Sequence, residues 1–287
     1  MADGQLDLFA DVEIGVEDLP RSAERSPPAA IPVGLMTDLG LIAAIPESSL
    51  DEACNLSAEA GRRRLATAVP GLAALCRRLA GFGAHRQVPE QAAAIEALAM
   101  IGGLEAAHAV SEMIERSVVQ GPTLQVAATA AARLGASLSP ATLRRLLTDD
   151  EPAVRADACR CARPLPELIL ILIDLVGDLD RRVARSAALA LARMGRAEAL
   201  PIVKDLLRNA PSEEVIGAAA SLIDDDCAVL LGRIARSGSA VSEAALLGLE
   251  DADHPRAAAI ADAVRRLRPQ ASDPVVENDH PRQSGSR

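Results

Sequence analysis

The closest pair of side chains that could hold a metal is Cys159 and Cys161, which form a Cys-x-Cys sequence. Residues two apart on a helix point about 200° away from each other, so these thiols cannot share an ion there. We expect both to act as small buried apolar residues. The four histidines lack metal-ligand spacing, and the chain shows no glycine-rich phosphate loop, nucleophile elbow or paired-carboxylate motif. We predict no metal, no cofactor and no catalytic residue.

Arginines are frequent in the middle of the chain, and a helical face lined with them could hold a protein partner or nucleic acid. The candidate residues for such a face are Arg144, Arg145, Arg155, Arg160, Arg181, Arg182 and Arg185. Acidic residues such as Asp157, Asp178 and Asp180 are interleaved with them. This pattern favours ion-paired turns and solvated faces, so nucleic-acid binding is possible but not the favoured interpretation.

The third candidate is the sequence QLDLF, from Gln5 to Phe9. Phe9 is one of only two phenylalanines in a chain that has no Trp and no Tyr. Apolar and polar residues alternate from Leu6 onward, which predicts an extended segment with one apolar edge. Phe9 falls on the polar side of this alternation, so an amphipathic strand gives no reason for it.

At all five positions QLDLF resembles the motif Gln-Leu-(Ser or Asp)-Leu-Phe, with which bacterial proteins bind the beta subunit of DNA polymerase, the sliding clamp. The resemblance implies that Gln5 hydrogen-bonds at a pocket rim and that Leu6 makes a secondary contact. Leu8 and Phe9 would insert into the clamp pocket, and Asp7 would face solvent or a basic rim. Burying Leu and Phe contributes about 1.5–3 kcal/mol each, offset by ordering, which predicts roughly micromolar affinity. Docking of Phe9 on its own chain and a chance match remain open.

The elements that position these residues are predicted to be helices. Apolar residues make up 49% of the chain and are mostly Ala, Leu, Val and Ile, whereas aromatic residues make up 1%. Ala and Leu are strong helix formers, and the aromatic residues that favour strands are nearly absent. We therefore expect an all-α protein.

Charge and cysteine content indicate the compartment and the kinds of partner. The net charge of −10 predicts a field that repels nucleic acid and anionic lipid. Five irregularly spaced cysteines argue against a disulfide framework and for a reducing compartment. The first twenty residues carry six acids and no Arg or Lys, unlike a signal peptide, and the apolar run from Leu168 to Ile173 is too short to span a bilayer. We expect a cytoplasmic protein with no membrane partner.

A helix-pair pattern recurs about every thirty residues. In the stretch from Leu179 to Asn209 it predicts a helix to Met194, a stop at Gly195 and a second helix from about Glu198 to Arg208. Each helix carries one apolar stripe at i, i+3, i+4 spacing. A single pair cannot bury two such stripes, but stacked pairs can, which predicts a solenoid.

The stretch DLDRRVARSAALALARMGRAEALPIVKDLL resembles the short bacterial HEAT-like repeat of the phycobilisome-lyase type. Val154 and Arg155 keep the Val-Arg pair of that repeat, whereas Val183 is followed by Ala184 and Arg185 comes one position late. The resemblance covers roughly residues 57–268. It implies an α-solenoid of HEAT-like helix pairs that acts as a binding surface, and it says little about the partner.

Composition divides the chain into four expected parts. They are a flexible acidic tail with motif and linker (1–34), a short helical cap (35–56), the HEAT-like solenoid (57–268) and a disordered tail (269–287). Ser49 to Glu52 predicts a capping box at the start of a helix. Phe82, between two glycines, is expected to fill the core at a turn.

Together these features predict a non-enzymatic adaptor or regulator in replication or repair. It would bind the sliding clamp through Gln5–Phe9 and a second protein through the solenoid face. Two alternatives remain open: a general protein scaffold with no clamp role, and a HEAT-like DNA-binding or DNA-repair protein. HEAT-like alkylpurine glycosylases surround the damaged base with aromatic residues, and a chain without Trp or Tyr lacks that arrangement.

Overall fold

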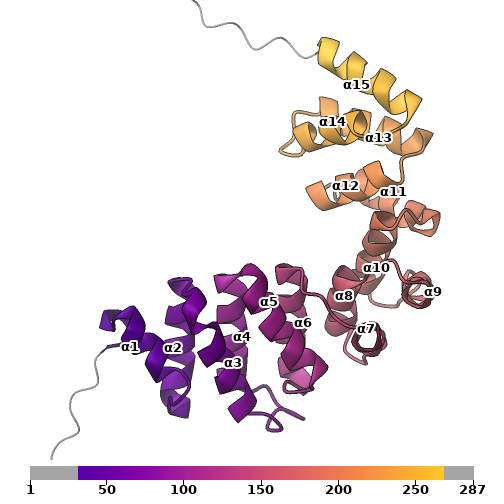
Figure 1. Cartoon of the computed structure of the whole chain (residues 1–287). Helices are drawn as coiled ribbons and strands as arrows, with labels where there is room; N and C mark the ends of the chain where they lie inside the picture. Colours follow the sequence, from indigo (N-terminus) through magenta and orange to yellow (C-terminus); the bar gives the residue numbers. More distant parts are fainter. Residues whose placement is uncertain (1–31, 268–287) are drawn as a thin grey trace, which may run out of the picture.

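The computed structural model describes residues 32–267, and every regular element in this part of the chain is helical (Figure 1). The expectations for the flanking residues, 1–31 and 268–287, lie outside the described residues. The first elements are η1 (Val33–Leu35), α1 (Asp38–Ala44), α2 (Leu50–Arg62), η2 (Ala66–Ala68), α3 (Val69–Arg78), α4 (Pro89–Ile101), α5 (Gly103–Glu115), α6 (Gly121–Leu134) and α7 (Pro140–Leu147). They continue with α8 (Pro152–Cys161), α9 (Pro166–Leu175), α10 (Arg181–Arg193), η3 (Ala197–Ala199), α11 (Leu200–Asn209), α12 (Glu213–Ser221), α13 (Asp225–Arg236), α14 (Ser242–Glu250) and α15 (Pro255–Leu267).

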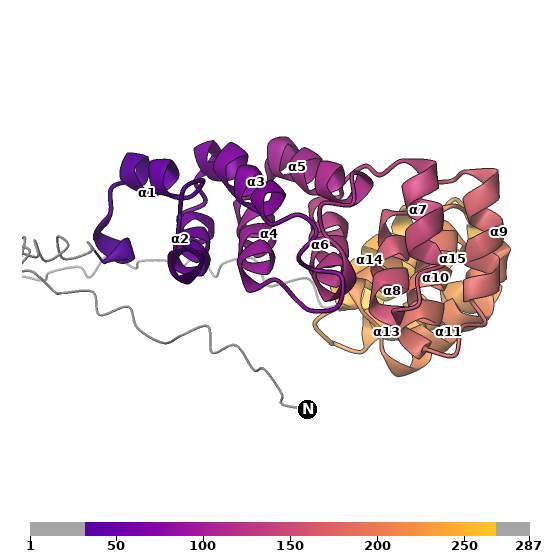
Figure 2. The ribbon, with the colours of Figure 1, turned by 90° about the horizontal axis from the view of Figure 1, so that it is seen from below.

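The helices form two layers in which even and odd numbers alternate. Each even helix from α2 to α14 packs against the next even helix, and we call this row the even layer. The odd helices cover its other side, as Figure 2 shows for α1, α3 and α5 beside α2, α4 and α6. The row turns near α8 and α10, which lie on the inner side of the arc, whereas α7 and α9 lie on its outer side (Figure 1). The predicted all-α solenoid of HEAT-like helix pairs is confirmed.

The helix boundaries follow local capping chemistry. Asp180 accepts a hydrogen bond from the backbone N–H of Arg182 at 2.8 Å, and Asp224 accepts one from Cys227 at 2.8 Å. Such caps satisfy backbone donors that have no partner inside the helix. Gly135 and Gly195 follow the ends of α6 and α10 with φ of 61° and 70°, a conformation that glycine adopts without strain. The helix stop predicted at Gly195 is confirmed.

The even layer packs closely because alanine is the most frequent residue at its buried positions. On α10, alanines at 187, 188, 190 and 192 are completely buried and alternate with buried Leu189 and Leu191. Between α2 and α4 the approach is closer still. A β-carbon on Gly61 would lie 2.8 Å from the α-carbon of Ala97 and 2.5 Å from Cε of Met100. At this point, therefore, only glycine allows the two helices their observed separation.

The N-terminal end of the solenoid is continuous with its repeats. The boundary expected between residues 56 and 57 falls inside α2, which begins after Ser49 as expected. The Ser49 hydroxyl donates to Glu52 at 2.8 Å and does not cap a backbone N–H. Arg63 donates to the carbonyls of Met36 at 2.8 Å and Gly34 at 3.1 Å, and it forms an ion pair with Glu59 at 2.6 Å. These bonds tie η1 to α2.

The expectation that Phe82 fills the core is wrong, since this side chain is 63% exposed. The inner side of its loop is occupied by backbone. Gly83 is buried, a β-carbon added to it would already lie 3.3 Å from the carbonyl oxygen of Gln120, and the N–H of Val88 donates to the Thr123 hydroxyl at 3.0 Å. The loop therefore directs its aromatic ring to solvent. Within residues 32–267, no helix combines the length and the apolar character that crossing a bilayer requires.

Gly61→Ala tests the close approach of α2 and α4. The added methyl would meet a main-chain atom of α4, so the two helices must move apart, and we expect the free energy of unfolding to fall by about 1–3 kcal/mol. The matched control is Gly217→Ala in α12, where nothing lies within 4 Å of the new methyl. This change is expected to raise stability by up to about 1 kcal/mol, because Ala favours a helix over Gly. Urea denaturation followed by circular dichroism measures both, and equal effects would contradict the packing.

Candidate partner-binding site

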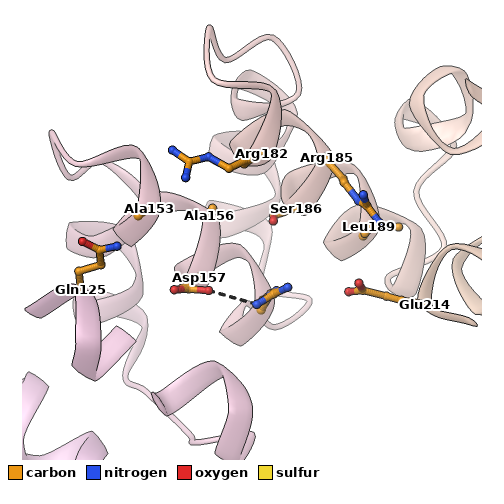
Figure 3. A pocket seen from close by; sticks show the side chains of 10 residues that line it. Gln125, Ala153, Ala156, Asp157, Arg182, Arg185, Ser186, Leu189 and Glu214 are labelled. Atoms are coloured by element: carbon orange, nitrogen blue, oxygen red, sulfur yellow. Dashed lines mark hydrogen bonds and ion pairs between the residues drawn. The ribbon is translucent and has the colours of Figure 1, made fainter. Parts of the chain in front are cut away.

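Residues of helices α6, α8, α10 and α12 of the even layer line a shallow hollow of about 460 Å³, whose side chains Figure 3 shows. We call it the arginine hollow. Its lining residues are Gln125, Ala153, Ala156, Asp157, Arg160, Arg182, Arg185, Ser186, Leu189 and Glu214.

Helical periodicity explains how α8 and α10 both reach the hollow. The lining positions of α8 are 153, 156, 157 and 160, and those of α10 are 182, 185, 186 and 189. Both sets have the spacing i, i+3, i+4, i+7, which places them on one face of each helix. The faces turned away carry the buried residues, for example Val154 and Val183. Ala153 and Ala156 are small and leave the space that the longer side chains border.

The carboxylates of the hollow are already bonded. Asp157 is 13% exposed, accepts a hydrogen bond from the Thr129 hydroxyl at 2.6 Å and pairs with Arg160 at 3.3 Å. Glu214 pairs with Arg193 of α10 at 3.5 Å.

The guanidinium groups extend further than these carboxylates. The side chains of Arg160 and Arg182 are 49% and 71% exposed. Within the part of the chain that the structure describes, Arg185 forms no ion pair. The hollow therefore presents cationic groups over carboxylates that are already bonded.

Arg182 also sets the ionisation of its neighbour Asp180. Their ion pair measures 2.8 Å, and the side-chain hydrogen bond, followed by the backbone N–H of residue 182, lowers the pKa of Asp180 from 3.8 to about 2. The same contact raises the pKa of Arg182. Both groups stay charged across the physiological range, so the border of the hollow keeps its charge pattern.

Four of the seven candidate arginines lie elsewhere. Arg155 is half-buried, donates to the carbonyl of Asp149 at 2.8 Å and pairs with Asp178 at 2.9 Å. Arg144 and Arg145 belong to α7 in the other layer, and Arg145 donates to the carbonyl of Ile114 at 3.0 Å. Arg181 begins α10 and does not line the hollow. Only Arg160, Arg182 and Arg185 come together.

The sequence did carry a signal for this separation. Arg155 follows Val154 directly, whereas Arg185 follows Val183 by two positions. One position on a helix is a rotation of about 100°. The shift moves the arginine of α10 away from the turn that Arg155 occupies on α8 and onto the face that lines the hollow.

Two further grooves flank the arginine hollow on the same layer. The groove between α4 and α6, about 510 Å³, is lined on its apolar side by Ala99, Met100, Val126 and Ala130, and it shares Gln125 with the hollow. The groove between α12 and α14, about 480 Å³, has Ile216, Ala220, Ala244 and Leu247 on its apolar side. We call them the α4–α6 groove and the α12–α14 groove. The even layer thus offers an apolar groove on each side of a cationic hollow.

The other predicted site residues that the structure describes do not line the arginine hollow. Gln5, Leu6, Asp7, Leu8 and Phe9 lie outside the described residues. Cys159 is buried and Cys161 half-buried, and burial raises the pKa of these thiols to about 12 and about 11. Over residues 32–267 no three histidine, cysteine or acidic side chains gather in a way that could hold a metal ion.

Arg155→Met tests the structural assignment of that arginine. It leaves the Asp178 carboxylate, which is only 8% exposed, without its cation, and we expect the free energy of unfolding to fall by about 2–4 kcal/mol. Arg182→Gln removes a pair whose arginine is 71% exposed, and it should cost much less than Arg155→Met because water screens the pair. Urea denaturation measures both variants. A smaller effect of the first than of the second would show that the two roles are assigned the wrong way round.

The pKa of Asp180 tests the border of the hollow. A lowered pKa contributes stability that is present above the ordinary value of 3.8 and is lost as the pH falls toward about 2. Arg182→Gln should raise the pKa toward 3.8 without reaching it, because the backbone N–H of residue 182 still donates. Carboxyl-detected NMR titration measures the midpoint. Arg181→Gln, one residue away, is the control and should leave it unchanged.

Comparison with known proteins agrees with this architecture. Residues 140–224, which run from α7 to α12 and include most of the arginine hollow, match the family of HEAT repeats. No curated protein matches the chain significantly. The central part of this solenoid is thus similar to HEAT repeats, which are typical of protein–protein interaction scaffolds.

Proposed function

We propose that this chain is a non-catalytic adaptor that holds a protein partner on the exposed face of its even layer and is recruited to the bacterial sliding clamp by Gln5–Phe9. The observation that carries the first half is the row of three adjacent hollows on one layer. The second half is supported by the match of QLDLF to the clamp-binding motif at all five positions. Acting on the clamp would require a cytoplasmic location.

The exposed face of the even layer has the composition of a binding surface. Met100 and Leu247 are 40% and 51% exposed in the two grooves. Large apolar side chains in contact with water are stabilised when a partner covers them. Asp157, the carboxylate deepest in the arginine hollow, is held by Thr129 and Arg160, which suits a positioning role better than proton transfer.

The position of the motif is compatible with simultaneous binding of two partners. Residues 10–31 separate Phe9 from the described part of the chain. At up to about 3.5 Å per residue these 22 residues can reach at most roughly 77 Å. A clamp bound at Phe9 therefore need not cover the even layer.

Gln5→Ala combined with Phe9→Ala tests recruitment. Against a purified bacterial sliding clamp we expect micromolar binding by the full chain and at least a tenfold loss in the double variant, because both the polar anchor and the largest apolar anchor are removed. Surface plasmon resonance measures the affinity. Phe82→Ala is the matched control, since it removes the other, exposed phenylalanine. Unchanged binding in the double variant would show that the motif is not the contact, and no binding by the full chain would leave a general scaffold without a clamp role.

A further inference from the structure

We infer that the arginine hollow binds an acidic segment of the partner protein, a short extended stretch with carboxylates at its centre and apolar side chains on both sides. This inference rests on the solenoid half of the proposed function and does not depend on the clamp motif. It assigns the recognition chemistry to Arg160, Arg182 and Arg185 and to the two grooves beside them.

Charge complementarity is the first argument. Three arginines line the hollow, and its two carboxylates are engaged by Arg160 and by Arg193. Arg182 pairs with Asp180 at the border of the hollow and is still 71% exposed. Arg185 has no ion pair among residues 32–267. A guanidinium matches a carboxylate with two parallel hydrogen bonds, so the exposed arginines are suited to Asp and Glu side chains. Because the net charge of −10 repels extended anions at long range, a cationic hollow in this chain favours a short anionic group.

The flanking grooves define the rest of the segment. Helices that pack together lie about 8–10 Å apart, so the three steps from α6 to α12 span about 24–30 Å. An extended peptide covers that distance in about eight residues at 3.3 Å each. Its centre would face Arg182 and Arg185. Its two ends would reach the α4–α6 groove with Met100 and the α12–α14 groove with Leu247.

The same lining argues against nucleic acid as the occupant. Beyond the hollow, Glu213 and Asp251 lie in the α12–α14 groove, which has no cationic lining residue. In the α4–α6 groove the charge of Arg133 is offset by Glu96. A strand of phosphates that left the hollow would meet carboxylates on one side and no net positive charge on the other, whereas a polyanion is bound by cations that follow its backbone. Arg144 and Arg145, which could have extended the basic surface, belong to the other layer.

The test uses the full chain and a fluorescein-labelled peptide of twelve residues with four central Glu and Asp residues and two leucines at each end. Two peptides serve as comparisons: one has lysines at the centre, and one has serines in place of the leucines. We expect fluorescence anisotropy to detect the acidic peptide, no binding of the lysine peptide and weaker binding of the serine peptide. The variant is Arg182→Glu with Arg185→Glu, which should weaken the acidic peptide on the order of tenfold or more.

The matched control variant is Arg144→Glu with Arg208→Glu. It changes the net charge by the same amount at exposed positions of α7 and α11 in the other layer, and it should alter the affinity less than twofold. Circular dichroism verifies that both variants are folded. No binding of the acidic peptide, or equal losses in the two variants, would overturn the inference.

Two competitor ligands distinguish an acidic partner segment from other possible occupants of the hollow. Tighter binding of a twelve-nucleotide single strand, lost in the hollow variant, would assign the site to nucleic acid instead. Residues 1–31 carry seven acids and two arginines, so a peptide of residues 1–20 that displaces the acidic peptide at lower concentration would assign it to the chain's own N-terminal segment. Clamp binding measured on the same hollow variant should be unchanged. If clamp binding is lost only in Gln5→Ala/Phe9→Ala, recruitment by the motif is supported whatever the peptides show. The two halves of the proposed function are thus tested separately.

Discussion

The close packing of the even helices through alanine and glycine is the constraint on which the rest of the structure depends. Each helix has one apolar stripe, and that stripe can be buried only between neighbours. Where Gly61 faces Ala97, the two backbones almost touch. Small residues on the buried side bring successive helices near enough that the stripes on the opposite side, at 153, 156, 157 and 160 and at 182, 185, 186 and 189, border one hollow. The binding face is therefore a consequence of how the core is packed.

Arginines divide into two groups with different physical roles. Arg63, Arg78, Arg145 and Arg155 each donate to main-chain carbonyls, mostly those of the preceding helix pair. Carbonyls at helix ends lack intrahelical partners, and leaving them unsatisfied in a partly buried place costs about 1–3 kcal/mol each. The arginines of the hollow make no such bonds through their guanidinium groups. A count of arginines in the sequence consequently overstates the cationic surface, because the first group is used to hold the repeats together.

Sequence alone predicted the repeat, the stacking of helix pairs and several boundaries, because these depend on local periodicity and capping. The stop at Gly195 and the buried Cys159 are examples. It failed where the outcome depends on distant contacts. Phe82 turns outward because Gly83 and Val88 fill the inner side of its loop by contacts with residues about 35 positions later. Likewise, side chains from four helices line the arginine hollow. The one sequence signal for it was the position of Arg185, two residues after Val183 instead of one.

Recognition of an acidic segment by an acidic protein involves two opposed electrostatic effects. The net charge of −10 repels a negatively charged peptide at long range, whereas the guanidinium groups attract it at contact distance. Salt screens both, and over a Debye length of about 8–10 Å it weakens the exposed long-range effect most. Salt dependence therefore cannot isolate the hollow. Reversing two charges inside the hollow or two outside it changes the global field equally, so the difference between those variants reports only the local contact. The apolar grooves then supply the part of the affinity that salt does not weaken.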